Sequence, residues 1–233
     1  MNLETLLPLI VIVGPTASGK SALAVKLAKK FNGEIVSADS RQVYRGLDIG
    51  SAKVTRREMD GIAHHLLDIA SPKRAMSAGK FQRLAARAIA GIAGRRKVPF
   101  LVGGTAFWVD TVAYGLRLPE VRPDPALRKR LAAKSATALL AILKKLDPAR
   151  AETIEQKNPR RLIRAIEIAS ALGRVPHLVK HSMFDTLWFG LKPSYEVGLH
   201  KMVERVDKML RRGLVAETKK LLASGVSKKR ISE

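Results

Sequence analysis

The segment that most restricts the fold of this chain is a glycine-rich stretch near its beginning. It consists of Gly14, Pro15, Thr16, Ala17, Ser18, Gly19, Lys20 and Ser21, and it matches the pattern Gly, four residues, Gly-Lys and Ser or Thr. An apolar run at 9–13 precedes it and a helical pattern at 21–31 follows it. In that setting the backbone N–H groups face one anion and the helix N-terminus adds its positive end. The stretch predicts an α/β fold whose loop binds a diphosphate or triphosphate.

Further short apolar runs, at 34–38 and 99–102, predict buried parallel strands, and a fourth strand is expected at 187–191. A helical pattern at 78–94 separates the second strand from the third. The order of strands and helices predicts a P-loop NTPase-like parallel sheet flanked by helices. We expect this core to comprise residues 1–118 and 184–233, with two helices in the last part that meet at Gly213.

The middle of the chain, 119–183, predicts a helical insertion in that core. Pro119, Pro123 and Pro125 interrupt its entry. The helical patterns that follow lie at 126–133, 137–146 and 159–172. The insertion is rich in basic residues, namely Arg128, Lys129, Arg130, Lys144, Lys145, Arg160, Arg161 and Arg164.

The composition indicates a polyanionic partner. The chain contains 43 Lys and Arg against 20 Asp and Glu, a formal net charge of +23. Such a charge attracts nucleic acid, because basic side chains that neutralise phosphates release counterions. A solubilising surface or an adaptation to high salt is the alternative explanation. The chain has no Cys, which excludes disulfides and fits a cytoplasmic location. The apolar run at 6–13 is too short to span a membrane, so no membrane partner is expected.

Polar and glycine residues stand where two of the predicted strands end. Asp39 follows the strand at 34–38, and Gly103, Gly104 and Thr105 follow the strand at 99–102. Ligands of open α/β sheets bind beyond the carboxyl ends of the strands, so we expect these residues to converge on the phosphate loop. Asp39 has two possible roles there, as a proton acceptor or Mg²⁺ ligand and as a cap of the next turn. Thr105 could cap a helix or donate a hydrogen bond into the site.

Three features bear on metal ions. The Ser21 hydroxyl can hold Mg²⁺ beside a bound phosphate, so Mg²⁺ is the predicted cofactor. The strand at 99–102 ends without the acidic residue that nucleotide hydrolases use for Mg²⁺, which disfavours an ATPase. The adjacent His64 and His65 rarely chelate one ion well, which favours a loop or packing role for them.

Several longer segments resemble the tRNA dimethylallyltransferases, also called tRNA isopentenyltransferases or the IPP transferase family. The matching segments are GPTASGKS at 14–21, ADSRQVYRGLDIGSAK at 38–53, HHLLDI at 64–69, VGGTAFW at 102–108, DPALR at 124–128, NPRRLIRAIEI at 158–168 and RVDKMLRRGLVAE at 205–217. They cover nearly the whole chain in the order of the family. The second segment is far more specific than the phosphate loop alone.

The resemblance implies a reaction in which dimethylallyl diphosphate donates its five-carbon group to an adenosine. The acceptor is the N6 amine of the adenosine at tRNA position 37, next to the anticodon, and diphosphate leaves. The implied partners are the donor and the tRNA anticodon stem-loop, bound by a monomer. The loop at 14–21 would bind the donor diphosphate, with Ser21 holding Mg²⁺. Asp39 would be the general base, assisted by Lys20 and Thr105. The residues that would contact tRNA are Asp39, Ser40, Arg41, Gln42, Thr105, Arg128, Arg160, Arg161 and Arg164.

The chain departs from the family pattern in three places. Family members usually continue past the position of Glu233, so the core is expected to be shortened. Tyr195-Glu196 and Lys201 stand where the family tends to carry Arg-Glu and a later Arg, and Phe107-Trp108 replaces an aliphatic-Tyr pair. Three alternatives remain: an adenylate isopentenyltransferase acting on free nucleotides, a small-molecule kinase, and a non-catalytic basic RNA-binding module.

Overall fold

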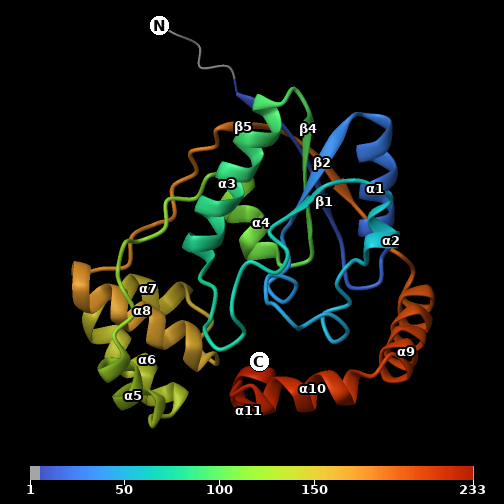
Figure 1. The fold of residues 1–233 in the computed structure, drawn as a ribbon. Coiled ribbons are helices and arrows are strands. Elements are labelled where there is room, and N and C mark those ends of the chain that lie inside the picture. The colour runs from blue at the N-terminus through green and yellow to red at the C-terminus, as the bar shows by residue number, and fades with distance from the viewer. Residues whose placement is uncertain (1–5, 233) are drawn as a thin grey trace, which may run out of the picture. The chain divides into compact units, whose positions relative to one another are not determined.

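The computed structural model describes residues 6–232, and it divides into two compact units. The α/β unit comprises Met1–Leu116 and Lys180–Glu233, and the helical unit comprises Arg117–Val179 (Figure 1). The helical unit covers most of the predicted insertion at 119–183.

A five-stranded sheet of order β3-β2-β4-β1-β5 forms the centre of the α/β unit. Its strands are β1 (Leu7–Val13), β2 (Gly33–Ser37), β3 (His64–His65), β4 (Val98–Gly103) and β5 (Phe184–Gly190). All neighbouring pairs are parallel. Val13 is opposite Gly103 of β4 and Gly190 of β5, so these strands end level with one another. The predicted P-loop NTPase-like fold is confirmed, although β5 begins earlier than expected and β3 was not predicted as a strand.

Helices cover both faces of this sheet (Figure 1). They are α1 (Lys20–Lys30) on one face, and α3 (Ala78–Gly94) and α4 (Ala106–Ala113) on the other. The remaining helices of the unit are α2 (Arg56–Met59), α9 (Tyr195–Arg211), α10 (Leu214–Ala223) and α11 (Lys228–Ser232). On one face, Phe81 of α3 stacks on Trp108 of α4, with ring centroids 4.3 Å apart, within a core that includes Val11 of β1. On the other face, Val25 of α1 packs in a cluster with Phe100 of β4. The sequence patterns did not predict α4, which follows β4 after a short glycine turn.

The helical unit has its own hydrophobic core. Its helices are α5 (Pro125–Ala132), α6 (Ala136–Leu146), α7 (Pro148–Thr153) and α8 (Pro159–Leu172), of which α7 was not predicted. Each begins after a side chain that accepts a backbone N–H, which is the favoured N-terminal cap; the caps are Asp124, Ser135, Asp147 and Asn158. Leu139 and Leu143 of α6 pack with Leu162 and Ile166 of α8 in the core. The unit is therefore a small bundle that can present charged side chains on fixed helices.

One buried carboxylate ties β2 to its neighbours in the α/β unit. Glu34 is 4% exposed and contacts Arg95 Nη2 at 2.6 Å, His65 Nε2 at 2.7 Å and Lys97 Nζ at 2.9 Å. Burial alone would raise the pKa of Glu34, but the hydrogen bonds from Arg95, His65 and Lys97 lower that pKa to about 2. A loop or packing role was expected for His64 and His65; they form the strand β3 instead, and His65 takes part in this ion-pair cluster.

Two properties of the helices concern the surface. No residue of α9 is buried, and its exposed apolar side chains are Val197, Leu199, Met202, Val203, Val206 and Leu210. Across residues 6–232, every helix is too short or too polar to span a lipid bilayer.

Candidate functional site

The phosphate loop follows β1 and leads into α1, as predicted. Its first residue, Gly14, has a φ of +156°, and a Cβ there would lie 2.5 Å from the carbonyl oxygen of Leu191. Leu191 itself donates its N–H to the carbonyl of Val13 at 2.8 Å, which holds the segment after β5 against the loop. Gly19, with a φ of +91°, occupies the N-cap of α1. Glycine is needed at Gly14 because the backbone of another segment fills the space of a side chain.

Lys20 folds over the loop from the first turn of α1. Its Nζ donates to the carbonyl of Pro15 at 2.6 Å and contacts Ser18 Oγ at 3.5 Å. Burial lowers the pKa of Lys20; the charge of Asp39 acts against this, and the charge of Arg205 lowers the pKa further. The charges of two residues from distant parts of the sequence therefore act on Lys20 at the phosphate loop.

Asp39, at the end of β2, performs the capping role that was one of its two predicted roles. Its Oδ1 accepts the N–H of Arg41 at 2.7 Å and that of Gln42 at 3.2 Å. The same carboxylate is close enough to Lys20 to oppose the lowering of the lysine pKa. The structure therefore shows the capping role, and the role as proton acceptor or Mg²⁺ ligand stays a prediction.

The end of β4 joins the ends of β1 and β2. Thr105 Oγ1 accepts the backbone N–H of Ser40 at 3.1 Å, and Thr105 does not cap α4 with its side chain. A Cβ on Gly103 would collide with the carbonyl of Ala38, so only glycine permits this close approach of β4 to β2. A Cβ on Gly104 would lie 3.8 Å from Lys20 Nζ. The three segments that were expected to converge are therefore in contact.

Gln42 is held on both ends of its amide group. Its Oε1 accepts from Ser37 Oγ at 3.3 Å, and its Nε2 donates to the carbonyl of Ala52 at 3.3 Å. Ser40, Arg41 and Gln42 are all half-buried. The segment after Asp39 is thus an ordered part of the site.

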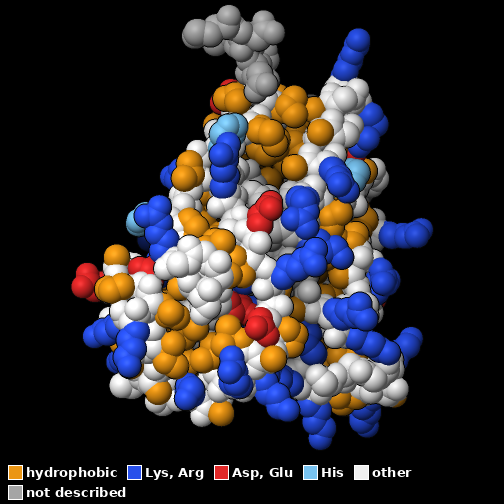
Figure 2. Space-filling view, turned by 90° about the vertical axis from the view of Figure 1, so that its left-hand side faces the viewer, with side chains coloured by type: hydrophobic (Ala, Val, Ile, Leu, Met, Phe, Trp, Pro, Cys, Tyr) orange, Lys and Arg blue, Asp and Glu red, His pale blue; other side chains and the backbone are white. Residues whose placement is uncertain are grey.

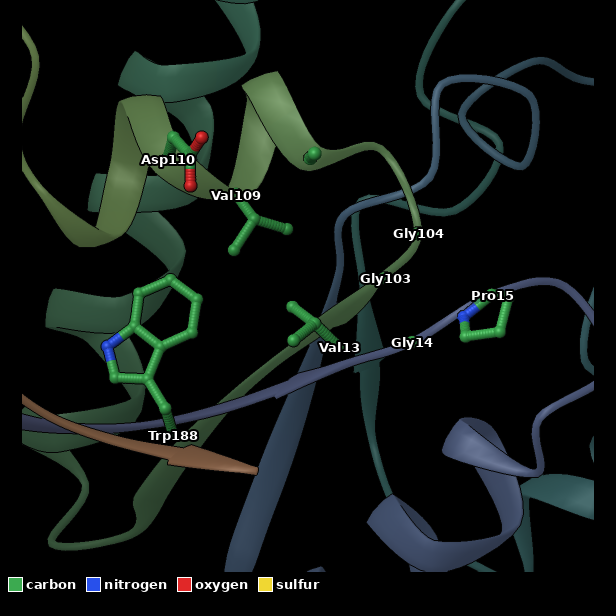
Figure 3. A pocket seen from close by; sticks show the side chains of 9 residues that line it. Val13, Gly14, Pro15, Gly103, Gly104, Val109, Asp110 and Trp188 are labelled. Atoms are coloured by element: carbon green, nitrogen blue, oxygen red, sulfur yellow. The ribbon is translucent and has the colours of Figure 1, made fainter. Parts of the chain in front are cut away.

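A cavity of about 320 Å³ opens beside the phosphate loop. Its lining residues are Val13, Gly14, Pro15, Gly103, Gly104, Ala106, Val109, Asp110 and Trp188. Figure 3 shows Val109 of α4 and Val13 of β1 pointing toward one another, with the Trp188 ring beside them. Most of this lining is apolar, and sequence analysis missed it because Ala106, Val109 and Asp110 belong to the unpredicted helix α4.

The residues at the loop fit a Mg²⁺ ion that is bound mainly through a substrate. Ser21 offers a hydroxyl in the first turn of α1. Within residues 6–232 no group of three or more His, Cys, Asp and Glu is arranged to hold a metal ion. Mg²⁺ commonly binds through one or two protein oxygens, substrate phosphates and water, so this donor set suits it.

The predicted tRNA-contacting arginines of the helical unit fall into two groups. Arg128 donates Nε and Nη2 to the two oxygens of the buried Glu167, at 2.7 and 2.6 Å, and Arg164 Nη1 reaches Glu167 Oε2 at 3.2 Å. Burial would raise the pKa of Glu167, but its hydrogen bonds, led by that from Arg128, lower it. Arg161 pairs instead with the exposed Glu155 at 2.9 Å, and Arg160 is exposed. The Arg128 side chain remains 45% exposed despite its pairing.

Sequence reasoning missed two charged residues that lie near the loops of the site. Arg205 of α9 affects Lys20 and donates Nη2 to the carbonyl of Ser51 at 3.3 Å. Glu217 of α10 accepts backbone N–H groups of the segment at 48–50. Both lie in the matching segment at 205–217, but no spacing rule connects that segment with a loop so far away in the sequence.

The surface carries the excess positive charge that the composition predicts. Figure 2 shows Lys and Arg side chains spread over the face in view, with few Asp and Glu among them. The net charge of +23 is therefore displayed on the surface, where it can act on a polyanion.

Comparison with known proteins identifies relatives over almost the whole chain. A family model described as IPP transferase matches residues 42–232. A tRNA dimethylallyltransferase of Roseiflexus sp. (strain RS-1) is 46% identical over 231 residues, which cover 94% of this chain and 74% of that protein. A tRNA dimethylallyltransferase of Bacillus pumilus (strain SAFR-032) is 39% identical over 232 residues, which cover 96% of this chain and 73% of that protein.

Solved structures show the same relationship. The tRNA isopentenylpyrophosphate transferase of Bacillus halodurans matches with a TM-score of 0.68 at 42% identity, covering 95% of this chain and 72% of that one. A eukaryotic dimethylallyltransferase acting on tRNA matches with a TM-score of 0.76 at 30% identity, covering 94% of this chain and 56% of that one. These matches confirm the resemblance seen in the sequence segments: the chain belongs to the IPP transferase family, whose members include the tRNA dimethylallyltransferases.

Proposed function

We propose that this protein transfers a dimethylallyl group from dimethylallyl diphosphate to the N6 amine of the adenosine at tRNA position 37, releasing diphosphate. The observation that carries the proposal is the convergence of three strand ends at one place. A Cβ on Gly104, after β4, would lie 3.8 Å from Lys20 Nζ of the phosphate loop. Thr105, the next residue, accepts the N–H of Ser40, which follows Asp39 at the end of β2. This convergence brings an anion-binding group and a proton acceptor to one place, in a chain whose relatives are named tRNA dimethylallyltransferase.

The phosphate loop binds the donor in this proposal. Backbone N–H groups of the loop, the N-terminus of α1 and Lys20 receive the diphosphate, and Ser21 would hold Mg²⁺ against it. Mg²⁺ supplies charge neutralisation for the phosphate oxygens when bound. The cavity of about 320 Å³ beside the loop takes the five-carbon group, because Val13, Val109 and Trp188 give it apolar walls.

Asp39 acts on the acceptor. An aromatic amine is a weak nucleophile, so the carboxylate accepts the N6 proton as the N–C bond to the dimethylallyl group forms. The C–O bond to the diphosphate breaks with its electron pair passing to the leaving oxygen, where Lys20 and the loop N–H groups stabilise the charge. Thr105, which follows β4, lies next to this centre. Its hydroxyl accepts the N–H of Ser40 and so holds the turn after Asp39 close to the phosphate loop.

The basic surface binds the RNA. Arg128, Arg160, Arg161 and Arg164 contact phosphates of the anticodon stem-loop, while the segment at 39–42 contacts the target nucleotide. The adenosine leaves the stack of the loop to reach a donor held at the strand ends, as bases do in enzymes that modify them. The net charge of +23 supports a substrate much larger than a mononucleotide.

The test is a transfer assay with labelled dimethylallyl diphosphate and Mg²⁺. Parallel reactions contain an anticodon stem-loop with adenosine at position 37, the same stem-loop with guanosine there, or AMP. Label in the first RNA alone supports the proposal, because the guanosine control lacks the N6 amine. Label in AMP alone would make the protein a free-nucleotide prenyltransferase, and RNA binding without label in any acceptor would make it a binding module.

A further inference from the structure

The carboxylate of Glu217, which the proposed chemistry does not use, accepts three consecutive backbone N–H groups. Oε2 accepts from Asp48 at 2.9 Å and from Ile49 at 2.8 Å, and Oε1 accepts from Gly50 at 2.9 Å. Hydrogen bonds to an ionised carboxylate are about twice as strong as those between neutral groups. The side chain therefore anchors the loop at 48–50 firmly to α10.

The approach of this loop to the C-terminal helices is close and has a second anchor. A Cβ on Gly50 would lie 3.2 Å from Leu214 Cδ1 and 3.4 Å from Glu217 Oε1, so a side chain there would press on the contact. At the next residue, the carbonyl of Ser51 accepts from Arg205 Nη2 at 3.3 Å. Helices α9 and α10 each hold one part of the same loop.

The loop continues directly into the contacts of the target-nucleotide segment. The carbonyl of Ala52 accepts Gln42 Nε2 at 3.3 Å, and the backbone N–H of Gln42 donates to Asp39 Oδ1 at 3.2 Å. The buried Lys53 holds the base of the loop by donating to Asp48 Oδ1 at 2.6 Å and to the carbonyl of Tyr44 at 2.8 Å. An unbroken series of hydrogen bonds and short chain segments thus links Glu217 to Asp39.

We infer that Glu217 is a positioning residue for the transfer step: by holding the loop at 48–50, it sets the place of Gln42 and Asp39 relative to the acceptor adenosine. The inference rests on the proposed function, and it predicts an effect on turnover that exceeds any effect on RNA binding. A small misplacement of reacting groups reduces rates steeply, whereas affinity for RNA comes mainly from phosphate contacts elsewhere.

The test variant is Glu217→Gln, which keeps the size of the side chain but places an amide NH₂ against backbone N–H groups. We expect kcat per folded molecule to fall about 10- to 100-fold, while the KM for dimethylallyl diphosphate and the Kd for the stem-loop change less than about threefold. Glu217→Asp keeps the charge on a shorter side chain and should give an intermediate kcat. The matched control is Glu204→Gln on α9, where the carboxylate makes only exposed ion pairs with His200 and Lys208.

A kcat of Glu217→Gln within twofold of the wild-type value would overturn the inference. So would a loss that matches the loss of folded protein, because that result is expected from a purely structural contact. The wild-type assay separates the two proposals. A wild-type protein that transfers nothing refutes the proposed function, and the positioning role of Glu217 is then tested by a structural measurement on the loop.

Amide hydrogen exchange supplies that structural measurement without any substrate. In Glu217→Gln, exchange at Asp48, Ile49 and Gly50 should accelerate about 10-fold or more, and exchange at Arg41 and Gln42 should accelerate with it. Amides within α1 should stay unchanged. Faster exchange at the three loop amides without any change at Arg41 and Gln42 would show that the loop is uncoupled from Asp39, which overturns the inference whatever the activity.

Discussion

The two units of this protein hold their charged residues in different ways. In the α/β unit, Lys20 begins α1, Asp39 follows β2 and Arg205 lies in α9, and the charges of Asp39 and Arg205 act on Lys20 only because the fold brings these segments together. In the helical unit, Arg128 lies on α5, and Arg164 and Glu167 lie on α8. Both helices have N-terminal caps and contribute to the unit's own hydrophobic core. The first arrangement depends on backbone geometry at many points, and the second depends on one buried carboxylate.

Because of this difference, we expect substitutions in the two units to have different effects. Substitutions at the strand ends should change the chemical step and leave the fold intact, because most of the supporting contacts are made by backbone groups. Substitutions around Glu167 should change the stability of the bundle first, because a buried charge without its partner is costly.

The largest effect is expected for Asp39→Asn. The amide keeps an oxygen that can accept the N–H groups of Arg41 and Gln42, but it cannot take the proton of the attacking amine. Transfer should fall about 10²- to 10⁴-fold, with stem-loop affinity within a few-fold, measured by single-turnover assays and RNA titration. Asp60→Asn, which removes an exposed ion pair with Lys29, is the control. Transfer at the wild-type rate would show that Asp39 is not the base.

Arg128→Gln tests the helical unit. The substitution removes the bidentate ion pair of Glu167, whose side chain is 1% exposed. Arg164 and the backbone N–H of Asp124 remain as partners of the carboxylate. We expect a loss of about 3 kcal/mol in the free energy of unfolding, measured by urea denaturation with a probe in this unit. A loss below about 1 kcal/mol, the usual value of an exposed pair, would break the contrast between the units.

Glu34 gives the α/β unit a defined response to acid. Its folded pKa of about 2 is below the ordinary value of 4.5, so its stabilisation is complete above pH 4.5 and is lost as the pH falls toward 2. The shift corresponds to at most about 3 kcal/mol. Glu34→Gln should therefore be less stable than the wild type at pH 7, and the difference should shrink between pH 4.5 and pH 2 in denaturant titrations. A difference that does not vary with pH would refute the ionic origin of the stabilisation.

Ala106→Phe fills part of the cavity beside the phosphate loop. Ala106 is exposed at the start of α4, so a larger side chain can enter the cavity without disturbing the core. We expect the KM for dimethylallyl diphosphate to rise about 10-fold, equivalent to about 1.4 kcal/mol, with unchanged stem-loop affinity. Ala90→Phe, on the exposed side of α3, serves as the control for a bulky substitution. An unchanged KM would mean that the five-carbon group binds elsewhere.

The smallest effect is expected for Arg161→Gln. The Arg161 side chain pairs with the exposed Glu155, so the free energy of unfolding should change by less than about 1 kcal/mol. If Arg161 contacts a tRNA phosphate, the slope of log K against log salt should decrease by about one. An unchanged slope would remove Arg161 from the RNA surface and would leave the remaining arginines to account for binding.

Most of the regular structure could be predicted from the sequence, because its signals are local. The apolar run before Gly14, the helical pattern at 78–94 and the helical patterns of the insertion each concern residues within a few positions of one another. The elements that were missed are short. Helix α4 follows a glycine turn, α7 has six residues, α11 has five, α2 has four and β3 has two, so none of them carries enough periodic pattern to stand out.

The sequence by itself determined the phosphate loop, the fold class, the family and the identity of Asp39 and Thr105 as residues at strand ends. Only the tertiary structure decided which distant groups join them. Arg205 donates to the carbonyl of Ser51, Trp188 forms part of the cavity wall, and Glu217 accepts N–H groups of the loop at 48–50. The physical reason is that strand ends are set by local hydrophobic patterns, whereas contacts across the sheet depend on strand order and on the return of the C-terminal helices. No spacing in the sequence encodes either of these.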